Sequence, residues 1–459
     1  MNILNNSLRK IYHTAIPLPL KYGPGFSRKF KFYFDHQTAS CDELRDYRLS
    51  RLKSLVEYAY AHVPYYRRLF VRNHIAPGDI QTLDDYRRIP TLHKDDVIAN
   101  HDLLKSDEFE KFNALQTTTS ASTRDGMVMY RSQEAETIRN AIIWRFWHNI
   151  GYRFRDPRVH LTILSRPDED YRDPHIDMNE NCLQFDPRTI TLEHAPVIYR
   201  QIKEFRPRMI FSQPSNLAML AFYWRQHNLA PLDIPLCCVL GEKVYPEYRE
   251  SITAFISGNL REYYGNRENT VSAAELDDGN MYINSDFVHV EFESNEGVPV
   301  AGAPANIIST GFENYAFPLI RYHTEDVGIN RGYPANAPVG FESMEVFGGR
   351  GRDLLLTRDG LICPNVVVQL TNANFHNYRR VQLEQVSLDH LRVRLEPSED
   401  FDDKRDIPIV EKAYADHFKS QFTIEVQVVD SIPTTPAYKH KLVVSELALS
   451  ELRKQCKSR

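Results

Sequence analysis

The stretch Asn314-Tyr-Ala-Phe-Pro-Leu-Ile-Arg-Tyr-His-Thr-Glu-Asp-Val-Gly328 is the part of the chain on which the fold prediction depends. Leu319, Ile320 and Tyr322 suit a half-buried strand, and a proline is tolerated at the first position of such a strand. The polar residues 323–328 then predict a turn that leaves Asp326 beside the strand end. A carboxylate held there can accept two hydrogen bonds from a ribose diol, although an ordinary surface turn with a capping aspartate has the same pattern.

Strands alternate with helices on the N-terminal side of this stretch, which predicts a largely parallel sheet. Alternating apolar residues nearer the stretch predict an antiparallel or barrel-like region. The remaining C-terminal residues read as a small α+β unit that begins with a hairpin turning at Asp359-Gly360. The predicted parallel strands are 158–164, 209–211 and 236–240, the later strands 281–293, 306–310, 317–322, 379–396 and 422–429, and the helices 42–62, 62–70, 132–151, 195–205, 215–227, 246–256, 364–376 and 406–420, with Asp42 as the cap of the first.

We therefore predict an α/β fold with a large N-terminal domain and a small α+β C-terminal domain. The large domain would combine mixed, largely parallel sheets and helices with the β-barrel-like region. The predicted boundaries are 1–40 for a lead-in segment, 41–350 for the large domain and 351–459 for the small one. A chain of 459 residues is long enough for such a division, since single small cores stop growing well below that length.

Composition limits the classes of partner and the compartment. The 56 basic and 61 acidic residues give a net charge of −5, so there is no overall positive field to attract nucleic acid or an anionic membrane. No run of about 18 apolar residues occurs, and we expect no transmembrane segment. The six cysteines are scattered without a Cys-x-x-Cys pair, which indicates reduced thiols in a cytoplasmic protein.

Several residues with useful chemistry follow predicted strands. The hydroxyl-rich loop from Thr117 to Gly126 can bind phosphate through hydroxyl and backbone N–H groups, although most such loops are merely solvated. Gly241-Glu242 follows a parallel strand, where crevices for ligands form. Tyr264 can lie against a flat base, and Glu268 can reach a metal. Candidates for a substrate pocket, for which core packing is an equally good explanation, are Trp147, Phe211, Ser212, Gln213 and Pro214.

These separate stretches occur in an order that resembles the adenylate-forming superfamily of acyl-CoA synthetases. The resemblance is closest to phenylacetate-CoA ligase-like proteins and, within them, to the CapK-like branch of capsular polysaccharide biosynthesis. It runs from about Tyr58 to the C-terminus. The residues that carry it are 62–68, 89–95, 117–126, Gly241-Glu242, 263–268, 273–275, 318–326, 349–360 and Lys439.

The resemblance implies an ATP-dependent reaction in which a small carboxylic acid becomes an acyl-adenylate and the acyl group then passes to CoA or another acceptor. Asp326 would hold the ribose, Tyr264 would stack on adenine, and Glu268 would hold Mg²⁺. Lys439, in a mobile C-terminal domain with its hinge at Asp353, would stabilise charge on the phosphate. The other implied positions are Gly241, Glu242 and Gly265 at the adenine site, Arg350 at the ribose or phosphate, Arg267 near the α-phosphate, and Ser120, Ser122, Thr123 and Arg124 in the phosphate loop.

The chain also departs from the pattern of these relatives. Its loop Ser120-Ala121-Ser122-Thr123-Arg124-Asp125-Gly126 lacks both glycines of the usual motif, and Arg267 stands where the wider superfamily has Ser or Thr. Tyr438 replaces the glycine before Lys439, which makes Lys441 a rival for the role of the catalytic lysine.

Three hypotheses follow. The first is a ligase that forms acyl-CoA, and Arg124 and Arg267 would then replace backbone contacts to phosphate. The second is a binding or scaffold protein that keeps the fold without ATP turnover, suggested by the altered loop. The third is a ligase with an amine acceptor on a sugar or peptide. A homodimer is suggested by the resemblance alone.

Overall fold

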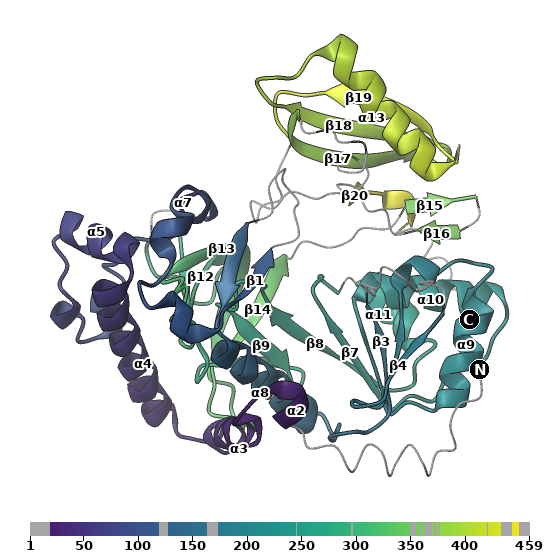
Figure 1. Cartoon of the computed structure of the whole chain (residues 1–459). Helices are drawn as coiled ribbons and strands as arrows, with labels where there is room; N and C mark the ends of the chain where they lie inside the picture. Colours follow the sequence, from purple (N-terminus) through teal and green to yellow (C-terminus); the bar gives the residue numbers. More distant parts are fainter. Residues whose placement is uncertain are drawn as a thin grey trace.

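A large mixed sheet forms the centre of the computed structural model (Figure 1). The structure describes residues 19–118, 127–162, 173–244, 246–294, 297–348, 355–358, 360–362, 370, 373, 375, 377–419, 421–432 and 443–448. Within these residues the sheet has twelve strands in the order β11-β12-β13-β14-β10-β9-β8-β7-β6-β3-β5-β4. The bounds are β3 Arg158–Leu161, β4 His175–Asp177, β5 Cys182–Phe185, β6 Met209–Ser212, β7 Leu236–Leu240, β8 Asn259–Gly265, β9 Ser272–Glu275, β10 Met281–Ile283, β11 Val288–Glu293, β12 Ala305–Gly311, β13 Tyr322–Gly332 and β14 Ser343–Gly348.

Strands β5, β3, β6, β7 and β8 are parallel, which confirms the predicted parallel sheet. Their successive residues point to opposite faces, so each face has its own core. Ile210 and Val239 pack with α9 (Ala195–Phe205), α10 (Pro214–Gln226) and α11 (Pro246–Thr253). Met209, Phe211 and Cys238 pack on the other face, with α8 (Gln133–Asn149).

The strands from β8 to β14 and on to β11 pair in antiparallel fashion. Helices α4 (Cys41–His62) and α5 (Pro64–Arg72) pack on this half (Figure 1). The predicted cap of α4, Asp42, is wrong. Ser40 caps the helix, because its side chain accepts from the backbone N–H of Glu43 while the Glu43 carboxylate accepts from the N–H of Ser40.

The strand predicted at 317–322 is also wrong. Leu319 and Ile320 are buried as expected, but the strand begins only at Tyr322, and Asp326 lies within it rather than in a following turn. The reason is Arg321, whose backbone is left-handed with φ +51°. Its buried guanidinium donates to Glu291, to Glu293 and to the backbone carbonyls of two residues before β1, Arg87 and Ile89. These bonds hold 317–321 as irregular chain against the core.

A separate four-stranded sheet, in the order β19-β18-β17-β20, lies toward the C-terminus with its own apolar core. Its strands are β17 Tyr378–Ser387, β18 His390–Pro397, β19 Thr423–Val428 and β20 Val443–Val444, and α13 (Asp403–Phe418) packs on it. The predicted hairpin is present as β15 (Leu355–Thr357) and β16 (Gly360–Ile362). Most of the helix predicted at 364–376 lies outside the described residues.

The remaining elements precede the sheet in the sequence, apart from one 3-10 turn that follows β5. They are α2 (Pro19–Tyr22), α3 (Phe26–His36), α6 (Leu83–Tyr86), α7 (Lys94–Ala99), β1 (Leu115–Thr118) and β2 (Val128–Arg131), with short 3-10 turns at Pro77–Asp79, His101–Leu104, Phe109–Phe112 and Pro187–Thr189. Helix α3 buries Phe26 and Tyr33 against the core beside α8. Among the described helices, none combines the length and the apolar character that crossing a bilayer requires.

Candidate functional site

Tyr264 and Asp326 lie together at the centre of the site. The Tyr264 hydroxyl donates to Oδ2 of Asp326 over 2.7 Å. Asp326 is 7% exposed, and its backbone N–H donates to Oγ1 of Thr324. Burial raises the pKa of Tyr264, so the phenol stays protonated and can donate to the carboxylate. The predicted base-stacking ring and the predicted ribose-binding carboxylate are therefore direct neighbours.

The turn between β8 and β9 carries Arg267 and Glu268. The side-chain carbonyl of Asn266 accepts from the backbone N–H groups of Thr270 and Val271, which orders the turn. Glu268 is half-buried, and its Oε1 accepts from the hydroxyl of Tyr322, the first residue of β13, over 3.2 Å. Arg267 is exposed. Glu268 thus lies between the ends of β8 and β13, close to the Tyr264 and Asp326 pair.

Gly241 and Glu242 lie where β7 ends, beside the end of β6. Gly241 has φ +84°, a conformation that favours glycine. Oε2 of Glu242 accepts from the backbone N–H of Ser215 in the first turn of α10, where a carboxylate is favoured by the helix dipole. A Cβ atom on Gly241 would lie 3.8 Å from Nε2 of Gln213. The structure therefore brings together Gly241, Glu242 and Gln213, which come from two adjacent strand ends.

Two of the substrate-pocket candidates, Trp147 and Phe211, lie on the α8 face of the sheet. The Trp147 and Phe211 rings are in edge contact with centroids 5.3 Å apart, and both are buried. Ser212 is 1% exposed. Sequence reasoning missed His160, whose ring lies 4.8 Å from that of Phe211. Burial, followed by the nearby Arg158, lowers the pKa of His160 to about 3, so its imidazole is neutral at physiological pH. Strict alternation along β3 would have placed it on this face.

A second group that sequence reasoning missed surrounds the start of α8. Nη1 of Arg131, the last residue of β2, lies 3.2 Å from Oε2 of Glu136. Arg139 donates to the same carboxylate from Nη2 over 2.5 Å and from Nε. The Glu136 and Arg139 spacing looks like an ordinary pair on a solvated helix surface, which is why the sequence offered no signal.

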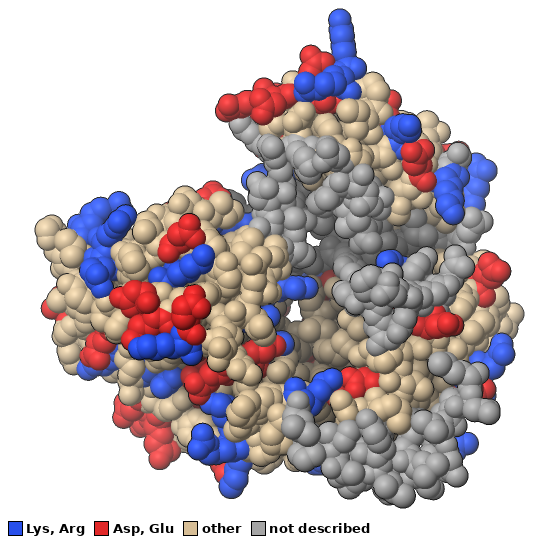
Figure 2. Space-filling view, in the orientation of Figure 1, with Lys and Arg blue, Asp and Glu red and all other residues tan. Residues whose placement is uncertain are grey.

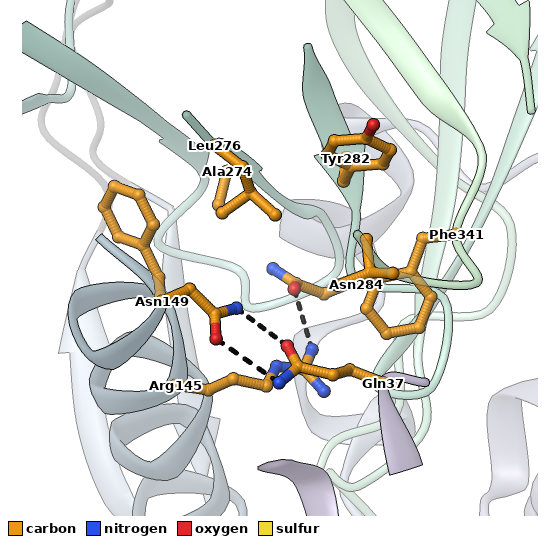
Figure 3. Close-up of a pocket in the computed structure, with 10 residues that line it drawn as sticks. Gln37, Arg145, Asn149, Ala274, Leu276, Tyr282, Asn284 and Phe341 are labelled. Carbon is orange, nitrogen blue, oxygen red and sulfur yellow. Dashed lines mark hydrogen bonds between the residues drawn. The ribbon is translucent and has the colours of Figure 1, made fainter. Parts of the chain in front are cut away.

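A pocket at the other end of α8 is occupied by paired polar groups (Figure 3). Gln37 and Asn149 exchange hydrogen bonds of 3.3 and 2.7 Å through their side-chain amides. Arg145 donates to Asn284, to both oxygens of Asp286 and to the backbone carbonyl of Tyr33. This network ties α3, α8 and the chain after β10 together, and we interpret it as structural.

The predicted residues that lie outside the described residues are Ser120, Ser122, Thr123, Arg124, Arg350, Asp353, Lys439 and Lys441. Their roles stay predictions, as do the individual roles of the residues described above.

The twelve-stranded mixed sheet with a separate C-terminal α+β sheet is the fold of the adenylate-forming ligases. A solved structure of 2-hydroxyisobutyryl-CoA ligase, in complex with 2-HIB-AMP and CoA, matches with a TM-score of 0.62 and 19% identity, covering 92% of this chain and 94% of that one. The same ligase in its postadenylation state with 2-HIB-AMP matches with a TM-score of 0.56. The predicted fold is confirmed.

Sequence relatives agree with this fold. The chain is 25% identical over 384 residues to phenylacetate-coenzyme A ligase of Pseudomonas putida, covering 78% of this chain and 84% of the relative. It is 26% identical over 382 residues to the Escherichia coli K12 phenylacetate-coenzyme A ligase, covering 79% and 84%. Residues 355–446 match the family CapK C-terminal domain. The resemblance to phenylacetate-CoA ligase-like and CapK-like members of the adenylate-forming superfamily is confirmed.

Proposed function

We propose that this chain is an ATP-dependent, AMP-forming ligase. It would activate a small carboxylic acid as an acyl-adenylate and then transfer the acyl group to CoA. The observation that carries the proposal is the 2.7 Å contact between Tyr264 and Asp326, which joins an aromatic ring near the end of β8 to a buried carboxylate within β13. The similarity to CoA ligases over most of the chain supports the same reaction class.

The nucleotide would bind between β8 and β13. Asp326 accepts hydrogen bonds from the two ribose hydroxyls, and the Tyr264 ring stacks on adenine, with Gly241, Glu242 and Gly265 at its border. In the present arrangement the Tyr264 hydroxyl uses one carboxylate oxygen of Asp326. A carboxylate has about four acceptor positions, so ribose can share or replace that bond.

Glu268 has the chemistry to hold Mg²⁺. The ion prefers carboxylate oxygens and keeps several waters, so one half-buried carboxylate beside the phosphates is a suitable protein ligand. Tyr322 donates to only one of its oxygens in this contact and fixes its orientation. When bound, Mg²⁺ would supply positive charge to the phosphates. Lys439 would stabilise the charge that develops as the substrate carboxylate attacks, which lowers the barrier more than it stabilises the ground state.

The division into domains completes the proposal. Residues 351–459 would move as a unit about a hinge at Asp353 relative to 41–350, and closure would bring Lys439 to the site and exclude water. The match to the CapK C-terminal domain supports a role in polysaccharide biosynthesis. We place this role in the cytoplasm because the scattered cysteines indicate reduced thiols.

The decisive experiment measures pyrophosphate release from ATP with a panel of aryl and short-chain acids, and identifies products by mass spectrometry in the presence of CoA. We expect release with at least one acid and formation of its CoA thioester. The Asp326→Ala variant is the matched control, because it removes the ribose contact. If the folded protein released no pyrophosphate with any acid of the panel, the proposal would be contradicted. If the acyl group of the adenylate passed only to amines, the proposed reaction would become amide formation.

A further inference from the structure

Two guanidinium groups, those of Arg131 and Arg139, meet near the start of α8. Arg131 is the last residue of β2, Arg139 lies in the second turn of α8, and Arg267 follows β8. Arg131 and Arg139 share the Glu136 carboxylate. Arg131 is also within electrostatic range of Arg139, Arg267 and Glu268. Residues from β2 and α8 therefore contribute positive charge to one place, and the exposed Arg267 of the β8–β9 turn adds to the field at Arg131.

This group is more than a solvated surface pair. The side chains of Arg131, Glu136 and Arg139 are only 17%, 24% and 30% exposed. Glu136 accepts hydrogen bonds from Arg139 and forms an ion pair with Arg131 at 3.2 Å, so one carboxylate holds both guanidiniums. An exposed pair on one helix would be flexible and largely screened by solvent. Here a strand residue and a helix residue are held together by the same carboxylate.

The charges of the group do not cancel. Three guanidiniums face two carboxylates, Glu136 and Glu268, which leaves one positive charge in excess. Burial lowers the pKa of Arg131, and the neighbouring Arg139 and Arg267 lower it further, against the opposing effect of Glu136. The surroundings of Arg131 therefore disfavour its own charge, and an added anion would relieve that cost.

We propose that Arg131, Arg139 and Arg267 form an oxyanion-binding cluster beside Glu268, an inference that rests on the proposed function. The oxyanion is a phosphate of ATP and pyrophosphate or a second anionic group on the substrate acid. The planar fork of arginine binds both groups in bidentate fashion. The cluster would supply positive charge in a chain whose loop Ser120–Gly126 lacks the glycines that let backbone N–H groups approach a phosphate closely.

The basic atoms that border the central hollow in Figure 2 are consistent with an anion reaching this side of the molecule. The same view shows acidic and basic side chains interspersed elsewhere on this face. Among the residues drawn in colour, this face therefore shows no continuous basic surface.

The test compares Arg131→Gln, Arg139→Gln and the double variant with the full-length chain. Calorimetric titration with inorganic pyrophosphate needs no turnover, so it remains valid even if no acid is activated. A charge-assisted hydrogen bond is worth enough that losing one weakens binding about tenfold or more. We expect that loss for each single variant and a larger one for the double. Arg200→Gln, at an exposed position on α9, is the matched control and should bind as the parent does.

A second arm separates the two sources of the anion. KM is measured for acids with one and with two anionic groups, alongside KM for ATP. A selective rise for ATP and weaker pyrophosphate binding assign the cluster to the nucleotide. A selective rise for the dianionic acid assigns it to the substrate. Folded variants that match the parent in every one of these measurements would overturn the proposal, and so would a parent chain that binds neither pyrophosphate nor any dianionic acid.

Discussion

The Tyr264 hydroxyl lies 2.7 Å from Oδ2 of Asp326, although three strands, β9, β10 and β14, separate β8 from β13 in the sheet. Four strand spacings in a flat sheet would place the two backbones about 19 Å apart. The antiparallel half must therefore curl until its ends face each other. Two further contacts, from Ser309 to Thr270 and from Tyr322 to Glu268, join the same two regions.

Substitutions at this pair will distinguish the contribution of the Tyr264 ring to ATP binding from that of its hydroxyl. Tyr264→Phe keeps the stacking surface, and we expect the Kd for ATP to stay within about threefold of the parent. Tyr264→Ala removes a base–aromatic stack worth about 1–3 kcal/mol, so ATP binding should weaken about tenfold or more. Asp326→Ala removes two charge-assisted hydrogen bonds of about 1.5–3 kcal/mol each, and ATP binding should weaken at least about 100-fold.

Calorimetry with ATP, together with circular dichroism to verify folding, measures these effects. If Tyr264→Phe lost as much affinity as Tyr264→Ala, the hydroxyl and not the ring would be the important group, and the stacking role would be wrong.

Arg321 stabilises the fold around Asp326. Its guanidinium is 4% exposed and pairs with Glu291 and Glu293, which are as deeply buried. Replacing it with alanine leaves Glu293 without this buried partner and Glu291 with only the more distant Arg87, at 3.5 Å, and removing one partner of a buried pair costs about 3–5 kcal/mol. Arg331, whose pair with Glu345 is about half exposed, is the matched control. Arg331→Ala should change the free energy of unfolding by less than about 1 kcal/mol.

Urea unfolding of Arg321→Ala and Arg331→Ala tests this difference. Equal stabilities for the two variants would mean that the buried network is dispensable.

Gly311 allows the β8–β9 turn to lie against β12. A Cβ atom there would stand 2.3 Å from the backbone carbonyl of Asn269. Backbone cannot move away cheaply, so Gly311→Ala should lower the free energy of unfolding by about 1–3 kcal/mol, a typical cost of overpacking. It should also reduce activity, because the turn carries Arg267 and Glu268. Gly78→Ala, where nothing lies within 4 Å, is the control and should stay within about 0.5 kcal/mol of the parent. A parent-like Gly311→Ala would refute the close approach.

The sequence predicted the elements whose structure depends on the local order of apolar and polar residues. Short apolar runs at 209–211 and 236–240 predicted β6 and β7 because buried parallel strands have no polar face. The run 317–322 failed because burial alone does not distinguish a strand from irregular chain held by a buried arginine. Similarly, Ser40 and Asp42 are both good caps by residue type, and only the reciprocal bonds with Glu43 decide between them.

The sequence predicted the individual residues of the site but not the contacts that join them. Tyr264 lies near the end of β8, Glu268 follows it and Asp326 lies within β13, and their resemblance to a ligase pattern predicted that they share one site. The curl of the antiparallel half, the bond from Tyr322 to Glu268 and the shared Glu136 carboxylate all join residues distant in sequence or in the sheet. Such contacts depend on tertiary geometry, which the periodicity of apolar residues in the sequence does not predict.

His289 on β11 is the group through which we expect stability to depend on pH. It is 4% exposed, and neither ring nitrogen has a hydrogen-bond partner within the described part of the chain. The Tyr86 ring packs against it, and the charged groups that face it are Arg48 from α4, Arg87 after α6, and Arg321. Burial first, and then these three guanidiniums, lower the pKa of His289 well below its ordinary value.

The sign of the pH effect follows from that direction. Unfolded histidine titrates near pH 6.5, so below this pH the unfolded chain takes up a proton that the folded chain refuses. The contribution of His289 to stability is therefore complete above pH 6.5 and is lost progressively as the pH falls toward its folded pKa. One pH unit below 6.5 corresponds to a loss of about 1.4 kcal/mol.

His289→Asn should reduce the difference in unfolding free energy between pH 7.5 and pH 5.5 by about that amount. His74→Asn, at an exposed position where asparagine suits the left-handed backbone, should leave the difference unchanged. Urea unfolding at the two pH values measures both variants, and a His289→Asn chain with the same pH difference as the parent would show that the buried imidazole does not couple folding to protons.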